Sequence, residues 1–279
     1  MIFRARHFEF VFPGPALVMG IVNVTPDSFF DGGRYLAPDA AVKHALELAA
    51  QGADILDVGG DSSRPGTQPA GEAEELARVI PVIKALAAQT KLPISIDTTK
   101  PAVARAALAA GASIVNDVAA HRRQDALWRV VAEFHAGYIC MHAQGDPAAM
   151  PAAASYQNVV AEVGRFFLDR LEQIGFAGVP AEQVVFDPGI GFGKTLEHNL
   201  QLLAGLPGLV GLDRPLLLGV SRKSFIGRLL GTPLAERLPA SLACASLAIA
   251  AGVQLIRVHD VAETVQAVRM TEAVMALRE

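Results

Sequence analysis

The sequence contains only two cysteines among its 279 residues, Cys140 and Cys244. Both lie within apolar runs and they form no C-x-x-C pair, which argues against a disulfide framework and against a cysteine-rich zinc site. Isolated thiols are typical of proteins kept in a reducing compartment, so we expect a cytoplasmic protein.

Long hydrophobic runs are also missing. The longest apolar stretch, ACASLAIAAGV at Ala243–Val253, falls short of the roughly 18 residues that indicate a membrane span. The N-terminal sequence MIFRARHFEF alternates in polarity and lacks the apolar segment of a signal peptide. These absences predict a soluble protein that does not act at a membrane.

Neither sign of charge is in excess. The chain has 24 Lys and Arg residues against 28 Asp and Glu residues, a formal net charge of −4. Such a balance gives no general attraction to nucleic acid or to anionic membranes. Any anionic ligand must therefore be held by a local cluster of basic side chains.

What the sequence does contain is a repeated pattern of short apolar runs, separated by alanine- and leucine-rich stretches with helical spacing. Consecutive apolar positions are typical of strands that are covered on both faces, as in a parallel sheet. Eight such runs begin at Ala16, Ala53, Pro93, Ser113, Gly137, Gln183, Pro215 and Gln254.

Eight strand–helix units predict an α/β fold of the closed (β/α)8 type, the TIM barrel, and an open doubly wound sheet is the alternative. Because no low-complexity linker divides the chain, we expect residues 1–279 to form a single domain. Residues 1–12 are predicted to form a short hairpin or plug beneath the barrel.

Local signals mark the ends of the expected helices. Asp39, after Pro38, is predicted to cap a helix that ends before Gly52. Pro101 suits the first turn of a helix that Gly111 ends.

Polar residues stand where the apolar runs stop. In a parallel barrel the carboxyl ends of all strands open at one mouth, where the reactive sites of such barrels lie. A single polar residue there is usually a helix cap or a turn residue, but a whole ring predicts a binding site. The ring consists of Asn23, Asp57, Asp97, Asn116, Asp117, His142, Asp187, Ser221, Arg257 and His259.

Part of this ring is suited to a flat ligand. Asp97, Asn116 and Asp187 offer carboxylate and amide groups that match the amidine-like edge of a fused heterocycle. The alternative is that Asn116 and Asp117 only satisfy buried backbone groups.

A second part of the ring is suited to phosphate. Arg257 and His259 end the last strand, which barrel closure places beside the first strand and therefore beside Asn23. These three residues predict an anion site, and the amide oxygen of Asn23 is a ligand that Mg²⁺ accepts.

The segment SRKSFIG, which follows the seventh run, has the character of a loop that leads into a helix N-terminus. Lys223 within it is suited to bind a carbonyl or a carboxylate, or to form a Schiff base as in barrel aldolases. We interpret Arg222 and Arg228 as solvated surface charges.

The segment DPGIGFGKT is similar to a P-loop but has Pro188 where that motif requires glycine. We interpret its glycines instead as allowing the backbone and Phe192 to approach a flat ligand. Two other segments, TPDSFFDGG and GGDSSRPGT, are predicted to be mobile lids whose Asp27 and Arg64 meet on closure.

Eight blocks of the sequence together resemble the dihydropteroate synthases, the pterin-binding barrels of folate synthesis. The blocks are MGIVNVTPDSFFDGG, DVGGDSSRPG, ISIDTTKP, IVND, CMHAQGDP, DPGIGFGKT, GVSRKSFIG and IRVHDV, from about Met19 to the end of the chain. The resemblance implies condensation of 6-hydroxymethyl-7,8-dihydropterin diphosphate with 4-aminobenzoate, assisted by Mg²⁺ in a homodimer. A pterin-binding methyltransferase and a catalytically silent paralogue are the alternatives.

The resemblance also implies roles for particular residues. It implies that the pterin is bound by Asp97, Asn116, Asp187 and Lys223, the diphosphate by Asn23, Arg257 and His259 with Mg²⁺ at Asn23, and the aminobenzoate by Ser63, Arg64, Phe192, Ser221 and Lys223. The implied catalytic residues are Asp97, Asp187, Lys223, Arg257, Asp27 and Arg64. Because Ser63 stands where the family usually has threonine, we expect altered packing around the aminobenzoate and around sulfonamides.

Overall fold

The structure, a computed structural model, describes residues 1–24, 37–61, 70–120, 122, 125–145 and 154–278. Within these residues, parallel strands alternate with helices along the chain. The parallel strands are β3 (Leu17–Asn23), β4 (Ile55–Gly59), β5 (Ile94–Asp97), β6 (Ile114–Asp117), β7 (Gly137–Met141), β8 (Val184–Asp187), β9 (Leu217–Gly219) and β10 (Leu255–Val258).

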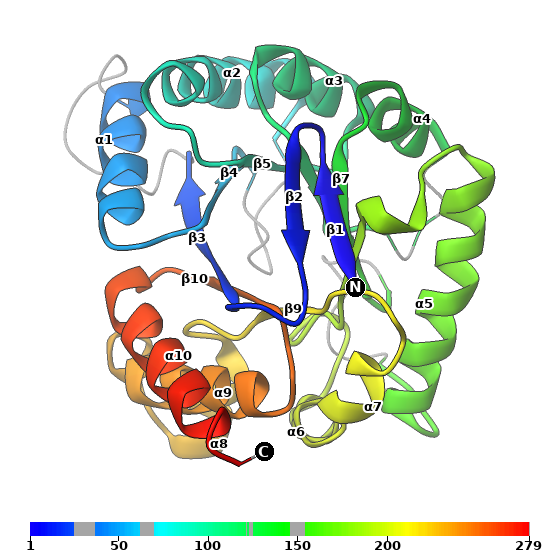
Figure 1. Cartoon of the computed structure of the whole chain (residues 1–279), viewed down its shortest axis with the longest axis vertical. Coiled ribbons are helices and arrows are strands. Elements are labelled where there is room, and N and C mark those ends of the chain that lie inside the picture. The colour runs from blue at the N-terminus through cyan, green and yellow to red at the C-terminus, as the bar shows by residue number, and fades with distance from the viewer. Residues whose placement is uncertain (25–36, 62–69, 121, 123–124, 146–153, 279) are drawn as a thin grey trace.

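These strands form one eight-stranded sheet in the order β8-β7-β6-β5-β4-β3-β10-β9. The first and last strands of that order also meet. Phe186 of β8 forms a parallel bridge to Leu216, and its backbone N–H donates to the carbonyl oxygen of Pro215 at 2.9 Å. The sheet therefore closes on itself, which confirms the predicted (β/α)8 barrel against the open sheet (Figure 1).

Helices surround the strands and cover their outer faces (Figure 1). Of the helices in the described ranges, none is both long enough and apolar enough to cross a bilayer. The helices are α1 (Ala37–Ala50), α2 (Glu72–Gln89), α3 (Pro101–Ala110), α4 (Asp125–Phe134), α5 (Val159–Phe176), η3 (Ala181–Gln183), α6 (Leu196–Ala204), α7 (Leu206–Val210), α8 (Ser224–Leu230), η4 (Leu234–Glu236), α9 (Leu238–Ala250) and α10 (Val261–Met275).

The helix ends follow the local signals with one exception. Pro101 opens α3, and Gly111, with φ of 122°, ends it as predicted. Asp39 does not cap α1, because the helix begins two residues earlier and places Asp39 in its first turn. A carboxylate in that position still interacts favourably with the positive end of the helix dipole.

The interior of the barrel is built in layers. An apolar layer of Met19, Ile55, Ile114, Ile139, Val185, Leu217 and Leu255 fills the lower part. Because side chains alternate between the two faces of a strand, the residues two positions further along point to the same interior. Four of those residues are polar or charged, and this polar layer consists of Asp57, Asn116, Asp187 and Arg257.

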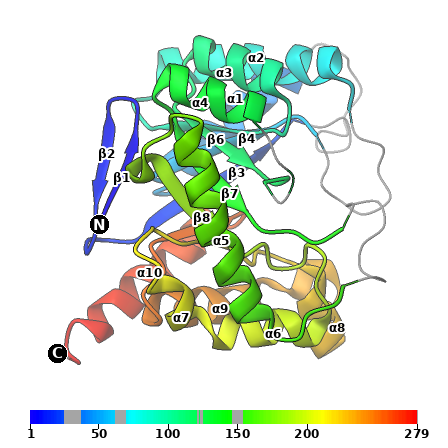
Figure 2. The ribbon, with the colours of Figure 1, turned by 90° about the vertical axis from the view of Figure 1, so that its right-hand side faces the viewer.

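An N-terminal hairpin closes the other end of the barrel. It consists of β1 (Ile2–Ala5) and β2 (Phe8–Val11), which pair antiparallel. Phe3 and Phe12 belong to the same buried cluster as the interior apolar layer, and a Cβ on Gly137 of β7 would lie 2.6 Å from Phe3 Cζ. Figure 2 shows the hairpin against one end of the barrel, which confirms the prediction for this segment.

Candidate functional site

Arg257 lies in the polar layer and contacts two carboxylates. Its Nε donates to Asp57 Oδ2 at 2.6 Å, and its Nη2 donates to Asp97 Oδ2 at 2.8 Å. Asn116 Nδ2 donates to the same oxygen of Asp57 at 3.1 Å, and the side chain of Asp57 is fully buried. Residues from β4, β5, β6 and β10 therefore meet in one hydrogen-bonded network at the mouth of the barrel.

Three buried polar atoms in this region have no hydrogen-bond partner among the described residues. They are Asp57 Oδ1, Ser95 Oγ and Asn116 Oδ1, which lie on the neighbouring strands β4, β5 and β6. A buried polar atom left unpaired costs about 1–3 kcal/mol. Such a group of unpaired atoms indicates that this part of the barrel is shaped to bind a polar ligand or water.

The loop after β8 meets the end of β9 through Asp187 and Lys223. Asp187 Oδ1 accepts a hydrogen bond from the Gly189 N–H at 2.7 Å. Lys223 Nζ donates to the carbonyl oxygen of Ile190 and lies 4.7 Å from the centre of the Phe192 ring. As predicted, Lys223 is directly followed by a helix, α8. The position of the Phe192 ring beside its ammonium group was not predicted.

Burial and neighbouring charges shift the pKa values of these groups. Burial raises the pKa of Asp97, against the opposing effect of Arg257, and raises the pKa of Asp187, against that of Lys223. Burial lowers the pKa of Lys223 to about 8, although the charge of Asp187 counteracts the fall. Burial by itself would lower the pKa of Arg257. The negative charges of Asp57 and Asp97 outweigh this effect, so the pKa of Arg257 is raised.

Asn23 and His259, two of the residues predicted to bind an anion, follow or end paired strands, and Ser221 lies beside His259. Ser221 Oγ is 3.0 Å from His259 Nδ1, and the backbone N–H of His259 donates to the same oxygen at 3.2 Å. β10 pairs with β3, which ends at Asn23. Asn23 is paired with Gly59 of β4, and Gly59 is paired in turn with Asp97 of β5. Asn23, Ser221 and His259 thus occupy the rim on adjacent strands.

Two members of the predicted ring do not face the mouth. Asp117 accepts hydrogen bonds from the Tyr138 hydroxyl at 2.6 Å and from the Ala119 N–H at 2.9 Å. His142 packs edge-on against Phe166 of α5, with 4.9 Å between ring centres. The prediction was wrong for both because strand residues alternate, so Asp117 points outward where Asn116 points inward.

Arg222 is not a solvated surface charge, so the prediction for it was wrong. Its Nε donates to Asp260 Oδ2 at 2.9 Å, and its backbone N–H donates to Ser241 Oγ at 2.9 Å. This pairing ties the turn after β9 to the start of α10. Arg228 is exposed, in agreement with the prediction.

Asp27, Ser63 and Arg64 lie outside the described residues.

Lys194 is not among the predicted site residues, but the structure places it in the interior with only 1% of its surface exposed. Its Nζ contacts the carbonyl oxygens of Gly189 and Phe192 at 3.0 and 2.9 Å. Nothing in the local sequence indicates this burial, because the GKT segment has the composition of an exposed loop.

The same loop makes close backbone contacts that only glycine permits. A Cβ at Gly189 would lie 1.9 Å from the carbonyl oxygen of His142, and Gly189 has φ of 63°. We expect Gly189→Ala to lower the free energy of unfolding by about 3 kcal/mol or more, because strain and overlap add. The measurement is urea-induced unfolding followed by circular dichroism.

Gly145 provides the matched control for this substitution. It has φ of 79°, and no described residue lies within 4 Å of a Cβ there, so Gly145→Ala tests the left-handed conformation. We expect it to cost about 1–2 kcal/mol. Equal losses in the two variants would show that the contact with His142 does not constrain the loop.

Comparison with known proteins identifies relatives over nearly the whole chain. The family model described as Pterin binding enzyme matches residues 19–259. The dihydropteroate synthase of Escherichia coli (strain K12) is 47% identical over 262 residues, which are 94% of this chain and 93% of that protein.

Solved structures agree with these relatives. A structure of Xanthomonas albilineans dihydropteroate synthase with 4-aminobenzoic acid is 49% identical, covers 96% of both chains and has a TM-score of 0.89. Another from that organism, in complex with 7,8-dihydropteroate, is 45% identical, covers 99% of both chains and has a TM-score of 0.88.

Proposed function

The chain belongs to the pterin-binding enzymes and, within them, to the dihydropteroate synthase family, and from this membership we propose the reaction and the residues that carry it. The enzyme is a transferase that joins 6-hydroxymethyl-7,8-dihydropterin diphosphate to 4-aminobenzoate, with release of 7,8-dihydropteroate and diphosphate. The observation that supports this most directly is the hydrogen-bonded network at the mouth, which joins Asn116, Asp57 and Arg257 of the polar layer to Asp97.

In this proposal the pterin ring lies against the polar layer. The unpaired Oδ1 atoms of Asn116 and Asp57 and the carboxylates of Asp97 and Asp187 accept hydrogen bonds from the N–H groups of the ring. Ser95 Oγ, also unpaired, lies on the strand between Asp57 and Asn116. Burial of these acceptors strengthens each hydrogen bond because the local dielectric is low.

The reaction replaces one bond at the methylene carbon of the pterin. The amine nitrogen of 4-aminobenzoate forms a bond to this carbon, the bond from carbon to the diphosphate oxygen breaks, and the proton of the amine passes to water or to the released diphosphate. Departure of diphosphate leaves positive charge that is delocalised into the ring. Asp97 and Asp187 stabilise this charge, so the site supplies electrostatic stabilisation and orientation and needs no strong base.

Arg257, His259 and Asn23 are proposed to bind the diphosphate. A guanidinium group has five N–H donors, and Arg257 uses Nε and Nη2 for Asp57 and Asp97. Its Nη1 has no partner among the described residues and is available to a phosphate oxygen. Arg257 thus joins the two halves of one substrate, with acceptors for the pterin on one side and the diphosphate on the other.

Mg²⁺ is proposed as the cofactor. The amide oxygen of Asn23 is the hard, uncharged kind of ligand that this ion accepts. The described residues include no cluster of three or more His, Cys, Asp or Glu side chains able to hold a metal ion, so Mg²⁺ would depend on phosphate oxygens of the substrate for most of its coordination. When bound, the ion supplies positive charge to the departing diphosphate.

The aminobenzoate is proposed to lie beside Phe192, with its carboxylate near Lys223 and Ser221. The ring of Phe192 offers a flat apolar surface, and the Lys223 ammonium group offers a positive charge beside it. Ser63 and Arg64 are proposed to complete this part of the site. The aryl amine is already nucleophilic, so orientation toward the methylene carbon is the main requirement.

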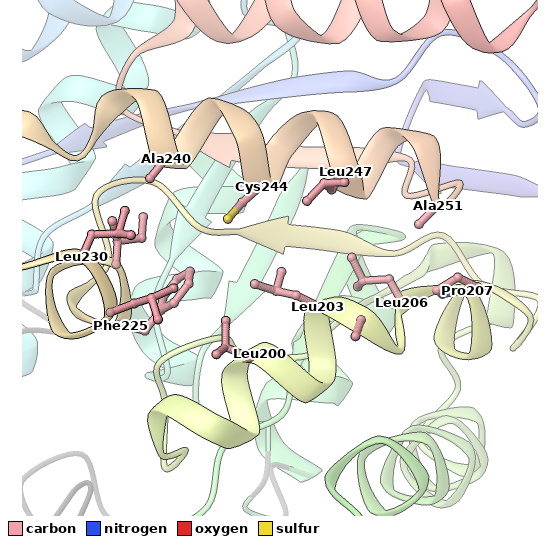
Figure 3. Close-up of a pocket in the computed structure, with 13 residues that line it drawn as sticks. Leu200, Leu203, Leu206, Pro207, Phe225, Leu230, Ala240, Cys244, Leu247 and Ala251 are labelled. Atoms are coloured by element: carbon pink, nitrogen blue, oxygen red, sulfur yellow. The ribbon is translucent and has the colours of Figure 1, made fainter.

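A homodimer is proposed because exposed apolar side chains gather on the last helices. Leu247 on α9 is 69% exposed and Met270 on α10 is 68% exposed. An apolar pocket of about 470 Å³ lies between α6, α8 and α9, lined by Phe225, Cys244 and Leu247 among others (Figure 3). Apolar surface of this kind is typical of a subunit interface.

A charge introduced on this surface is expected to separate the subunits. In Leu247→Glu, association would bury a carboxylate without a partner, so we expect light scattering to detect a monomer where the unmodified chain is a dimer. Leu168→Glu is the matched control, because Leu168 is an exposed leucine, 51% exposed, on α5 rather than on α9 or α10. A monomeric unmodified chain would contradict the proposed dimer.

We also propose that residues 1–279 form one domain that resides in the cytoplasm. One buried hydrophobic cluster extends from Ala16 to Val268 and includes side chains from strands and helices throughout the barrel. Cys140 and Cys244 are free thiols, which is consistent with a reducing compartment.

The proposed reaction is tested by the release of diphosphate. We expect release only when the pterin diphosphate and 4-aminobenzoate are both present, with dihydropteroate formed in equal amount. Omission of either substrate is the control. Transfer of a methyl group from methyltetrahydrofolate, or an absence of release with both substrates, would overturn the proposal.

A further inference from the structure

Lys194 is a buried lysine in the loop that joins β8 to α6, and its ammonium group is enclosed by four acceptors. Nζ lies 3.0 Å from Gly189 O, 2.9 Å from Phe192 O, 3.2 Å from His142 O and 3.0 Å from His142 Nδ1. Burial lowers its pKa to about 7, against the opposing effect of Asp187. A buried ammonium group is costly without partners, and the carbonyl oxygens of the loop are these partners.

The loop is folded around this ammonium group. Gly189 and Gly193 both have positive φ, which turns the carbonyl oxygens of residues 189 and 192 toward Nζ. Asn199 holds the outer part of the loop, because its Oδ1 accepts from the Gly191 N–H and its Nδ2 donates to Thr195 O, each at 2.7 Å. The shape of the loop therefore depends on side chains that do not face the mouth.

The opposite side of the loop contacts Lys223. Lys223 Nζ donates to Ile190 O and lies beside the ring of Phe192. Lys194 thus binds the carbonyl of Phe192 from the interior while Lys223 contacts its ring from the mouth. If the hydrogen bonds of Lys194 were lost, the loop would shift. The Phe192 ring and the Ile190 carbonyl, which accepts from Lys223, would move with it.

We propose that Lys194 is a positioning residue for the aminobenzoate part of the site, which acts by fixing Phe192 and the Ile190 carbonyl and through them Lys223. The inference rests on the proposed function, because the reaction defines this part of the site. The pterin acceptors Asp97 and Asn116 are on β5 and β6, and their hydrogen bonds do not involve the loop that Lys194 holds. The third acceptor, Asp187 at the end of β8, contacts this loop only at its start, through the Gly189 N–H. The effect of Lys194 is therefore confined mainly to one of the two substrates.

The test compares the KM values of the two substrates in Lys194→Met, which keeps the length of the side chain and removes its donors. We expect KM for 4-aminobenzoate to rise by about tenfold or more and KM for the pterin diphosphate to change by less than about threefold. Lys194→Gln restores an N–H donor on a shorter side chain. Its KM for 4-aminobenzoate is expected to lie between that of the unmodified enzyme and that of Lys194→Met.

Tyr156→Phe is the matched control, because Tyr156 precedes α5 and contacts the same loop from outside. It removes one hydrogen bond, from the Tyr156 hydroxyl to Gly193 O at 3.1 Å, without disturbing the contacts of Lys194. We expect both KM values to change by less than about threefold. A purely structural role of Lys194 would lower the fraction of active enzyme and leave the ratio of the two KM values unchanged.

The outcomes separate this inference from the proposed reaction. An inactive unmodified enzyme would remove the reaction and the inference together. An active unmodified enzyme with an unchanged KM ratio in Lys194→Met, or with equal rises for both substrates, would overturn the inference alone. Loss of folding in both Lys194 variants would also overturn it, because Lys194 would then contribute only to stability.

Discussion

Arg257→Ala is expected to reduce turnover by about 10³-fold, because the departing diphosphate loses its main cationic partner. The substitution also leaves Asp57, whose side chain is fully buried, without its ion pair. Removing one partner of a buried ion pair costs about 3–5 kcal/mol, so we expect a loss of that size in the free energy of unfolding. The measurements are diphosphate release at saturating substrates and urea-induced unfolding.

The double variant Asp57→Asn/Arg257→Ala separates the two effects. Removing the carboxylate of Asp57 relieves the unpaired charge, so most of the lost stability is expected to return. Turnover is expected to stay low, because the diphosphate still lacks its cation. A single Arg257→Ala variant that turns over like the unmodified enzyme would remove the diphosphate assignment.

Asp187→Asn is expected to weaken pterin binding by about 100-fold, since hydrogen bonds to a charged acceptor contribute about 1.5–3 kcal/mol. It also has an effect on pH dependence. The charge of Asp187 raises the pKa of Lys223, which burial otherwise lowers to about 8. Without that charge the pKa of Lys223 falls further. As the pH rises, Lys223 therefore loses its proton, and its positive charge, at a lower pH than in the unmodified enzyme.

The measurements are pterin titration by calorimetry and the pH profile of kcat/KM for 4-aminobenzoate. The alkaline limb of the profile is expected near pH 8 in the unmodified enzyme and at a lower pH in the variant. Asp54→Asn is the matched control, because Asp54 also accepts a backbone N–H, from Val18, but at the start of β4. An alkaline limb that stays in place would show that Asp187 does not act on Lys223.

The architecture could be predicted from the sequence because its signals are local and repeated. Each apolar run is continuous enough to indicate a buried parallel strand, and Pro101 and Gly111 mark the ends of one helix. The mouth of the barrel followed from geometry, since parallel strands place all their carboxyl ends on one side. The interior position of Asn116 and Asp187 depends only on that pattern.

Contacts between distant segments could not be predicted in the same way. The ion pair of Asp57 and Arg257 joins residues 200 positions apart, and that of Arg222 and Asp260 joins residues 38 apart. Nothing in the composition of either segment indicates its partner. Lys194 shows the same limit, because its burial depends on carbonyl groups that converge only after the loop has folded.

The hairpin of β1 and β2 has a kinetic consequence. Because Phe3 and Phe12 seal the far end, substrates and products use a single opening. The side chains that accept hydrogen bonds from the bicyclic ring lie deepest in the barrel. Ser221 and His259 lie nearer the opening, because each follows an interior strand residue, Gly219 or Arg257, by two positions. We therefore expect ordered addition, in which the larger substrate enters first and the condensed product leaves after the diphosphate through the same passage.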